Sequence, residues 1–112
     1  MELAVLIINK EEFLETLLEA YIEIGISGST IIDSIGMGHI LASDVPIFAG
    51  LRFMFAGSRP YNKTIISVIK EDKIELVKEA VENTLGPLSE NGNGILFFIP
   101  IREVVGLKSE IK

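Results

Sequence analysis

The chain twice places a short apolar run directly before an amphipathic helical pattern, and this repetition restricts the folds open to it. Residues 3–8 read Leu-Ala-Val-Leu-Ile-Ile, and residues 63–69 read Lys-Thr-Ile-Ile-Ser-Val-Ile. Such runs are typical of strands. After each run, over 13–22 and 74–85, apolar side chains recur at helical spacing with glutamates on the opposite face. The sequence therefore predicts two strand-helix units.

Two further runs complete the predicted order of elements. The β-branched segment 30–35 and the apolar segment 95–99 each indicate a strand. Asn9 is the expected N-cap of the first helix, Gly25 ends that helix, and Gly86-Pro87 ends the second. The order predicts an α+β, ferredoxin-like βαββαβ fold, an antiparallel sheet with two helices on one face. Residues 102–112 are expected to add a short edge element and then fray.

The length of 112 residues fits a single domain spanning 1–112, with a long excursion at about 38–60 between the second and third strands. When a compact domain has so long a connection, either the connection is functional or the helices and strands on each side of it have been assigned wrongly. In the predicted fold the helices cover one face of the sheet, and no part of the chain is left to cover the other. Together with a mean hydropathy of +0.44, this predicts that the uncovered face of the sheet is buried against further copies of the chain.

Composition excludes several classes of function. The net charge of −6 disfavours binding to nucleic acid, which needs clustered cations. The chain has no cysteine and one histidine, His39, and no cluster of acids and histidines has metal-ligand spacing. A non-catalytic protein is therefore expected. No uninterrupted apolar stretch of about eighteen residues and no signal-peptide pattern occur, so we expect a cytoplasmic protein without membrane insertion.

Two kinds of segment are candidates for binding. Glycines flank the second helix and the last strand, where backbone N–H groups could approach an anion, although their spacing alone favours ordinary turn residues. The apolar segment 45–55, Val-Pro-Ile-Phe-Ala-Gly-Leu-Arg-Phe-Met-Phe, is a surface that packs on another copy of the chain, a docking surface for another protein, or a buried part of the fold.

Four segments taken together resemble the P-II signalling family, over nearly the whole chain from 3 to about 108. Residues 24–31 (Ile-Gly-Ile-Ser-Gly-Ser-Thr-Ile) resemble the turn from the first helix to the second strand. Residues 35–38 (Ile-Gly-Met-Gly) resemble the start of the family's T-loop. Phe48-Ala49-Gly50 with Phe53-Met54 resembles motifs within that loop, and 92–97 (Gly-Asn-Gly-Ile-Leu-Phe) resembles the segment before the last core strand.

The resemblance implies a homotrimeric regulator of nitrogen metabolism with adenine-nucleotide sites in the clefts between subunits. It also implies that the long loop docks on a partner transporter or enzyme. The ligand-binding residues it implies are Gly28, Ser29, Thr30, Gly36, Gly38, His39, Gly86, Gly92, Gly94 and Lys108. The docking residues on the loop are Ile47, Phe48, Leu51, Arg52, Phe53 and Phe55.

This sequence departs from the family pattern at the positions that matter for nucleotides. Ile95 stands where the family has a phosphate-binding lysine, and Gly106 and Lys108 stand at two arginine positions. Loss of these cations weakens a triphosphate site, so a less charged ligand, or none, remains open and no cofactor is assigned with certainty. Phe48 lacks the hydroxyl that uridylylation needs. The chain is thus identified as a divergent, P-II-like protein.

Two other functions compete with this one. The first is a non-catalytic sensor of an amino acid or other metabolite on another ferredoxin-like domain. Such sensors use the turn after the first strand, which here is Asn9-Lys10-Glu11 and lacks a glycine. The second is an enzyme of the same fold, for which His39 is the only histidine available as a base.

Overall fold

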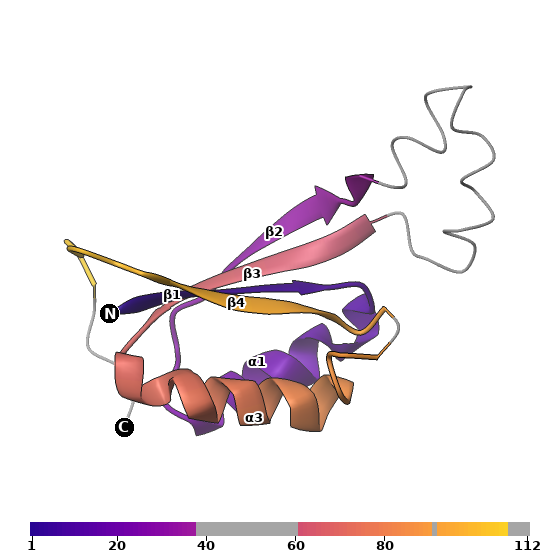
Figure 1. The fold of residues 1–112 in the computed structure, drawn as a ribbon, viewed down its shortest axis with the longest axis horizontal. Coiled ribbons are helices and arrows are strands. Elements are labelled where there is room, and N and C mark those ends of the chain that lie inside the picture. The colour runs from indigo at the N-terminus through magenta and orange to yellow at the C-terminus, as the bar shows by residue number, and fades with distance from the viewer. Residues whose placement is uncertain (38–60, 91, 108–112) are drawn as a thin grey trace.

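A computed structural model describes residues 1–37, 61–90 and 92–107 and forms one sheet with two α-helices (Figure 1). The strands are β1 (Glu2–Ile8), β2 (Thr30–Ile35), β3 (Tyr61–Ile69) and β4 (Gly94–Pro100). The helices are α1 (Leu14–Glu23) and α3 (Ile74–Leu85), and each follows a single 3-10 turn, η1 (Glu11–Phe13) and η3 (Glu71–Lys73). The predicted α+β class, with four strands and two α-helices, is therefore confirmed for the described parts of the chain.

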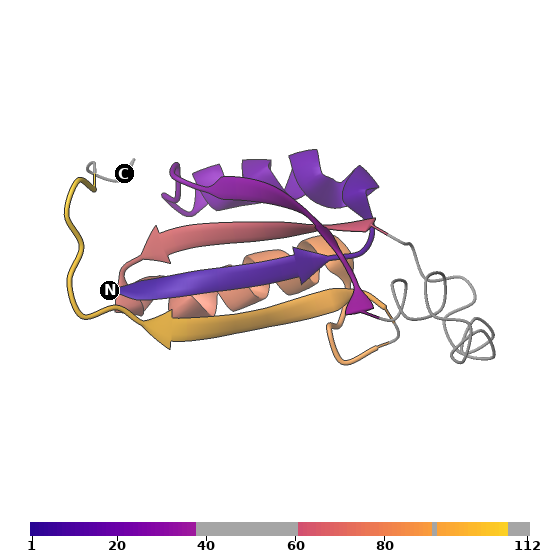
Figure 2. The ribbon, with the colours of Figure 1, turned by 90° about the horizontal axis from the view of Figure 1, so that it is seen from above.

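The sheet has the strand order β2-β3-β1-β4, and all three pairings between neighbours are antiparallel. Both helices lie on the same side of the sheet (Figures 1 and 2). This small α+β arrangement is compatible with a ferredoxin-like fold. The predicted excursion at 38–60 lies outside the described residues.

The core lies between the sheet and the two helices. Strand residues alternate between faces, so every second residue of β1 and β3 points towards the helices. These residues meet one stripe of each helix, spaced by three or four positions. The fully buried members are Leu6, Ile8, Leu17, Tyr21, Ile65, Ile69, Val77 and Val81.

Helix ends depart from the sequence prediction in one respect. Asn9 is not an N-cap, because the residues at the N-cap positions of η1 and α1 are Lys10 and Phe13, neither of which makes a side-chain cap. The Asn9 amide instead donates to the carbonyl oxygen of Gly92 at 3.0 Å. The C-terminal prediction is confirmed: Gly25, with φ of 88°, follows the last turn of α1, and Gly86, with φ of 83°, caps α3. The predicted edge element in the tail is absent from residues 101–107, which contain no strand.

No described helix lies over the second face of the sheet (Figure 1). Its centre consists of Leu3, Val5 and Ile7 of β1, paired with Val68, Ile66 and Thr64 of β3 and with Ile99, Phe97 and Ile95 of β4, and all of these except Thr64 are apolar. None of the strand residues on this face is charged. Four of its large side chains are strongly exposed: Ile32, Ile95, Phe97 and Ile99. We call this surface the open face.

Candidate functional site

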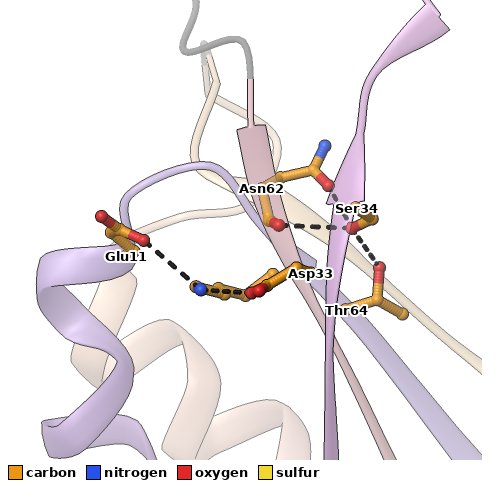
Figure 3. A network of polar contacts seen from close by, with 6 residues as sticks. Glu11, Asp33, Ser34, Asn62 and Thr64 are labelled. Atoms are coloured by element: carbon orange, nitrogen blue, oxygen red, sulfur yellow. Dashed lines mark hydrogen bonds and ion pairs between the residues drawn. The ribbon is translucent and has the colours of Figure 1, made fainter.

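The paired ends of β2 and β3 carry a polar network at the point where the chain leaves for residues 38–60 (Figure 3). The Ser34 hydroxyl donates to the side-chain oxygen of Asn62, and its oxygen also lies 2.8 Å from the Thr64 hydroxyl. A hydroxyl has one proton to give, so Thr64 is the donor to Ser34 when Ser34 donates to Asn62. The chain of bonds joins both strands on the rim of the open face.

An ion cluster occupies the other face of the same strand pair. The Lys63 ammonium donates to an Asp33 carboxylate oxygen, directly across the ladder, and lies 3.6 Å from Glu11 Oε2 on η1 (Figure 3). The hydrogen bond to Asp33, foremost, and the nearby carboxylates raise the pKa of Lys63 above its usual value. Because the two carboxylates are largely exposed, the cluster adds little to stability, and its main effect is to orient these side chains.

These two clusters hold the ends of β2 and β3 together on both faces of the sheet. The Ser34 hydroxyl bonds to the Thr64 hydroxyl and to Asn62, which is neutral and cannot act as a general base. The network therefore lacks the adjacent base that would activate a hydroxyl nucleophile. What the arrangement does supply is a fixed pairing of the ends of β2 and β3.

The first group of predicted ligand residues lies where the chain enters β2. Thr30 is the first residue of β2 and pairs with Ile66. The Ser29 hydroxyl lies 2.6 Å from that of Ser67, which is 2% exposed on the helix side of β3. Gly28 has open space where a Cβ would be. Ser29 therefore satisfies a buried hydroxyl, and its binding role stays a prediction.

The second group gathers at the opposite end of the sheet. Gly36 directly follows β2, and Gly94 opens β4 against the end of β1. A Cβ on Gly94 would lie 2.6 Å from the Ile7 carbonyl oxygen, so this glycine is required by close approach of the two strands. Gly86 and Gly92 have positive φ angles in the turns between α3 and β4. Within one chain, these glycines lie at the other end of the sheet from Ser29, with Gly36 directly after the edge strand β2 and Gly94 on the opposite edge strand β4.

The remaining predicted residues lie outside the described parts of the chain. They are Gly38, His39 and Lys108 among the ligand residues, and the docking residues Ile47, Phe48, Leu51, Arg52, Phe53 and Phe55. Ile95, which stands where the P-II family has a phosphate-binding lysine, lies on the open face and is 58% exposed.

Neither cluster was predicted from the sequence. Asp33 and Lys63 are opposite charges in facing strands, a pair that stabilises a sheet, but their pairing is visible only once the register is known. The same holds for Ser34 and Asn62, which face each other one step along the ladder.

Comparison of the chain with models of known protein families finds no match, and comparison with curated proteins finds none. Among the described residues, no group of three histidine or acidic side chains is placed to hold a metal ion. No helix in the described segments is long and apolar enough to cross a membrane.

Proposed function

We propose that this chain is a P-II-like regulatory protein that assembles as a homotrimer. It docks on a partner transporter or enzyme through the apolar segment 45–55, and a small ligand gates the docking. The role is non-catalytic. The observation that carries the proposal is the open face, a large uncharged apolar surface that the described chain does not cover.

The distribution of charge supports a second copy of the chain as the cover of the open face. The chain carries a net charge of −6, yet most of its described acidic residues lie on the helices and their leading turns, on the other side of the sheet. Copies that meet through their open faces bury apolar surface without placing like charges opposite each other. Their acidic helix surfaces then point outward, where they favour solubility.

The polar network at the ends of β2 and β3 supports the docking role. A segment that contacts a partner binds more strongly when its two ends are already positioned, because less conformational freedom is lost on binding. The bonds among Ser34, Asn62 and Thr64 and the Lys63–Asp33 pair hold together the ends of β2 and β3, the strands between which residues 38–60 run in the sequence.

Sedimentation equilibrium at micromolar concentration tests the assembly. We expect a particle of three times the 12.3 kDa chain mass. Phe97→Lys places a charge in the open face and should release monomers. Leu76→Lys is the matched control, because Leu76 on α3 is 42% exposed and Phe97 is 41% exposed, so the two differ in location rather than accessibility. A monomeric wild-type chain, or equal effects of the two variants, would contradict the assembly.

Isothermal titration with ATP, ADP and AMP tests the ligand. Because this chain lacks cations at phosphate-binding positions of the family pattern, its affinity for the nucleotide should not rise from AMP to ATP: each added phosphate brings negative charge without a cationic partner. An ATP affinity far above that of AMP would show that phosphate groups are recognised by other residues and would overturn this part of the proposal.

A further inference from the structure

A groove runs between α3 and the edge strand β4. Because β4 is the last strand on its side of the sheet, no further strand covers the outer flank of α3 (Figure 1). The groove encloses about 360 Å³. Its lining comes from one stripe of α3, from the turn after this helix and from the helix-facing side of β4: Ile74, Lys78, Glu82, Leu88, Leu96 and Phe98.

The floor of the groove is apolar. Ile74, Leu88, Leu96 and Phe98 are partly buried and pack against the core between helices and sheet. An apolar group placed on this floor loses contact with water on all but its outer side. Removing apolar surface from water in this way is favourable by roughly 25 cal/mol per Å² of apolar area.

The rim carries one charge of each sign. Lys78 and Glu82 are four residues apart on α3, which separates them by about 6 Å along the helix axis. The Lys78 ammonium lies 3.2 Å from Glu75, in a pair whose side chains are 50% and 82% exposed. Exposed pairs of this kind are weak, so the ammonium can turn to a ligand at little cost.

A backbone N–H group at one end of the groove positions the Glu82 carboxylate. One of its oxygens accepts a hydrogen bond from the Leu88 backbone N–H at 3.1 Å. The turn that carries Leu88 is itself fixed, because the Asn93 amide, 9% exposed, donates to the Pro87 carbonyl oxygen at 2.7 Å. A carboxylate can accept about four hydrogen bonds, so Glu82 retains acceptor capacity for a ligand.

We propose that this groove binds an α-amino acid with a large apolar side chain. The ligand carboxylate pairs with Lys78, the ligand ammonium pairs with Glu82, and the side chain lies on the apolar floor. A zwitterion matches a rim with one cation and one anion, whereas a multiply charged anion would meet Glu75 and Glu82 as like charges. The volume is at the small end of ligand sites, as a ligand of this size requires.

This inference deepens the proposed function, because it names the class of the gating ligand and places the site within one chain. Binding is measured by isothermal titration with L-leucine and L-phenylalanine, and located by backbone amide shifts in two-dimensional NMR. We expect shifts in 74–88 and 94–98. Leucinamide and N-acetyl-leucine each lack one charge of the zwitterion and should bind at least about tenfold more weakly, since a charged hydrogen bond is lost.

Two variants test the rim. Lys78→Gln and Glu82→Gln should each weaken leucine binding about tenfold or more, while the glutamine at 82 can still accept from Leu88 N–H. Lys70→Gln and Glu79→Gln are the controls, because each removes the same charge from a residue outside the groove lining. Unchanged thermal unfolding of all four variants shows that the fold is intact.

Three results would overturn the inference: no binding of either amino acid at millimolar concentration, equal binding of the blocked analogues, or amide shifts confined to other parts of the chain. Sedimentation of the same variants separates this result from the proposed assembly. The groove lies on the helix side of the sheet, so loss of leucine binding should leave the mass of the particle unchanged.

Discussion

Replacement of Gly94 by alanine tests how closely β4 approaches β1. Gly94 has a φ of 144°, and a Cβ there would lie 2.6 Å from the carbonyl oxygen of Ile7. The obstructing atom belongs to the backbone of the central strand, and the adjacent pair Ile8–Gly94 fixes the register at that point. The clash can therefore be relieved only by moving one strand away from the other.

The expected loss follows from two terms. Holding a residue with a Cβ in an unfavourable backbone region costs about 1–3 kcal/mol. Forcing an extra carbon into a filled space costs a further ~1–3 kcal/mol. Gly94→Ala should thus lower the free energy of unfolding by at least about 2 kcal/mol, a large share of the roughly 5–15 kcal/mol available to a domain. For a chain of this length the melting temperature should fall by about 8 °C or more.

Urea unfolding followed by circular dichroism measures this loss, with Gly28→Ala as the control. Gly28 has no positive φ and no atom within 4 Å of the added carbon. The control should be neutral, or stabilised by up to about 1 kcal/mol because alanine restricts the unfolded chain. A Gly94→Ala protein within about 0.5 kcal/mol of wild type, at an unchanged urea m-value, would show that the strands are not held at this distance.

Three further outcomes are expected. Burial raises the pKa of Tyr21 to about 12, so its contribution to stability is fully present below pH 10, and the free energy of unfolding should fall by up to about 1.4 kcal/mol per pH unit between pH 10 and 12. In Tyr21→Phe the free energy of unfolding should depend less steeply on pH over that range. Equal slopes in the two proteins would refute the assignment. Ser29→Ala leaves the buried Ser67 hydroxyl without its partner and should cost about 1–3 kcal/mol in urea unfolding. The double variant Ser29→Ala/Ser67→Ala should lose less free energy of unfolding than the two single variants added together. Strict additivity would mean that the two hydroxyls do not interact. Phe97→Lys should raise the monomer fraction in sedimentation, and an unchanged mass would exclude the open face as the contact.

Much of the fold could be predicted from the sequence because its signals are local. Helical spacing of apolar residues from Phe13 to Ile22 and from Ile74 to Leu85 indicated both helices, and the first turn of each helical segment proved to be 3-10. The cap prediction for Asn9 failed because its amide found a more distant acceptor, the carbonyl of Gly92. A local pattern does not reveal such competition from a residue far along the chain.

The candidate site was less predictable because it depends on register and on strand order. Asp33 and Lys63 meet only because β2 and β3 pair with one particular alignment. The groove beside α3 exists only because β4, and not another strand, lies at the edge of the sheet. Neither fact is contained in the spacing of residues along the chain.

The central position of β1 has a consequence for synthesis of the protein. Strand β1 is synthesised before the other described strands and is among the most apolar, whereas both of its neighbours, β3 and β4, are made much later. Until β3 emerges, β1 has no described strand to pair with, and its second edge is filled only when β4 emerges, as the pair Leu3–Ile99 illustrates. Pairings between such distant segments form slowly. The apolar strand β1 therefore stays without its described partner strands for much of translation, and an unpaired apolar strand of this kind promotes aggregation.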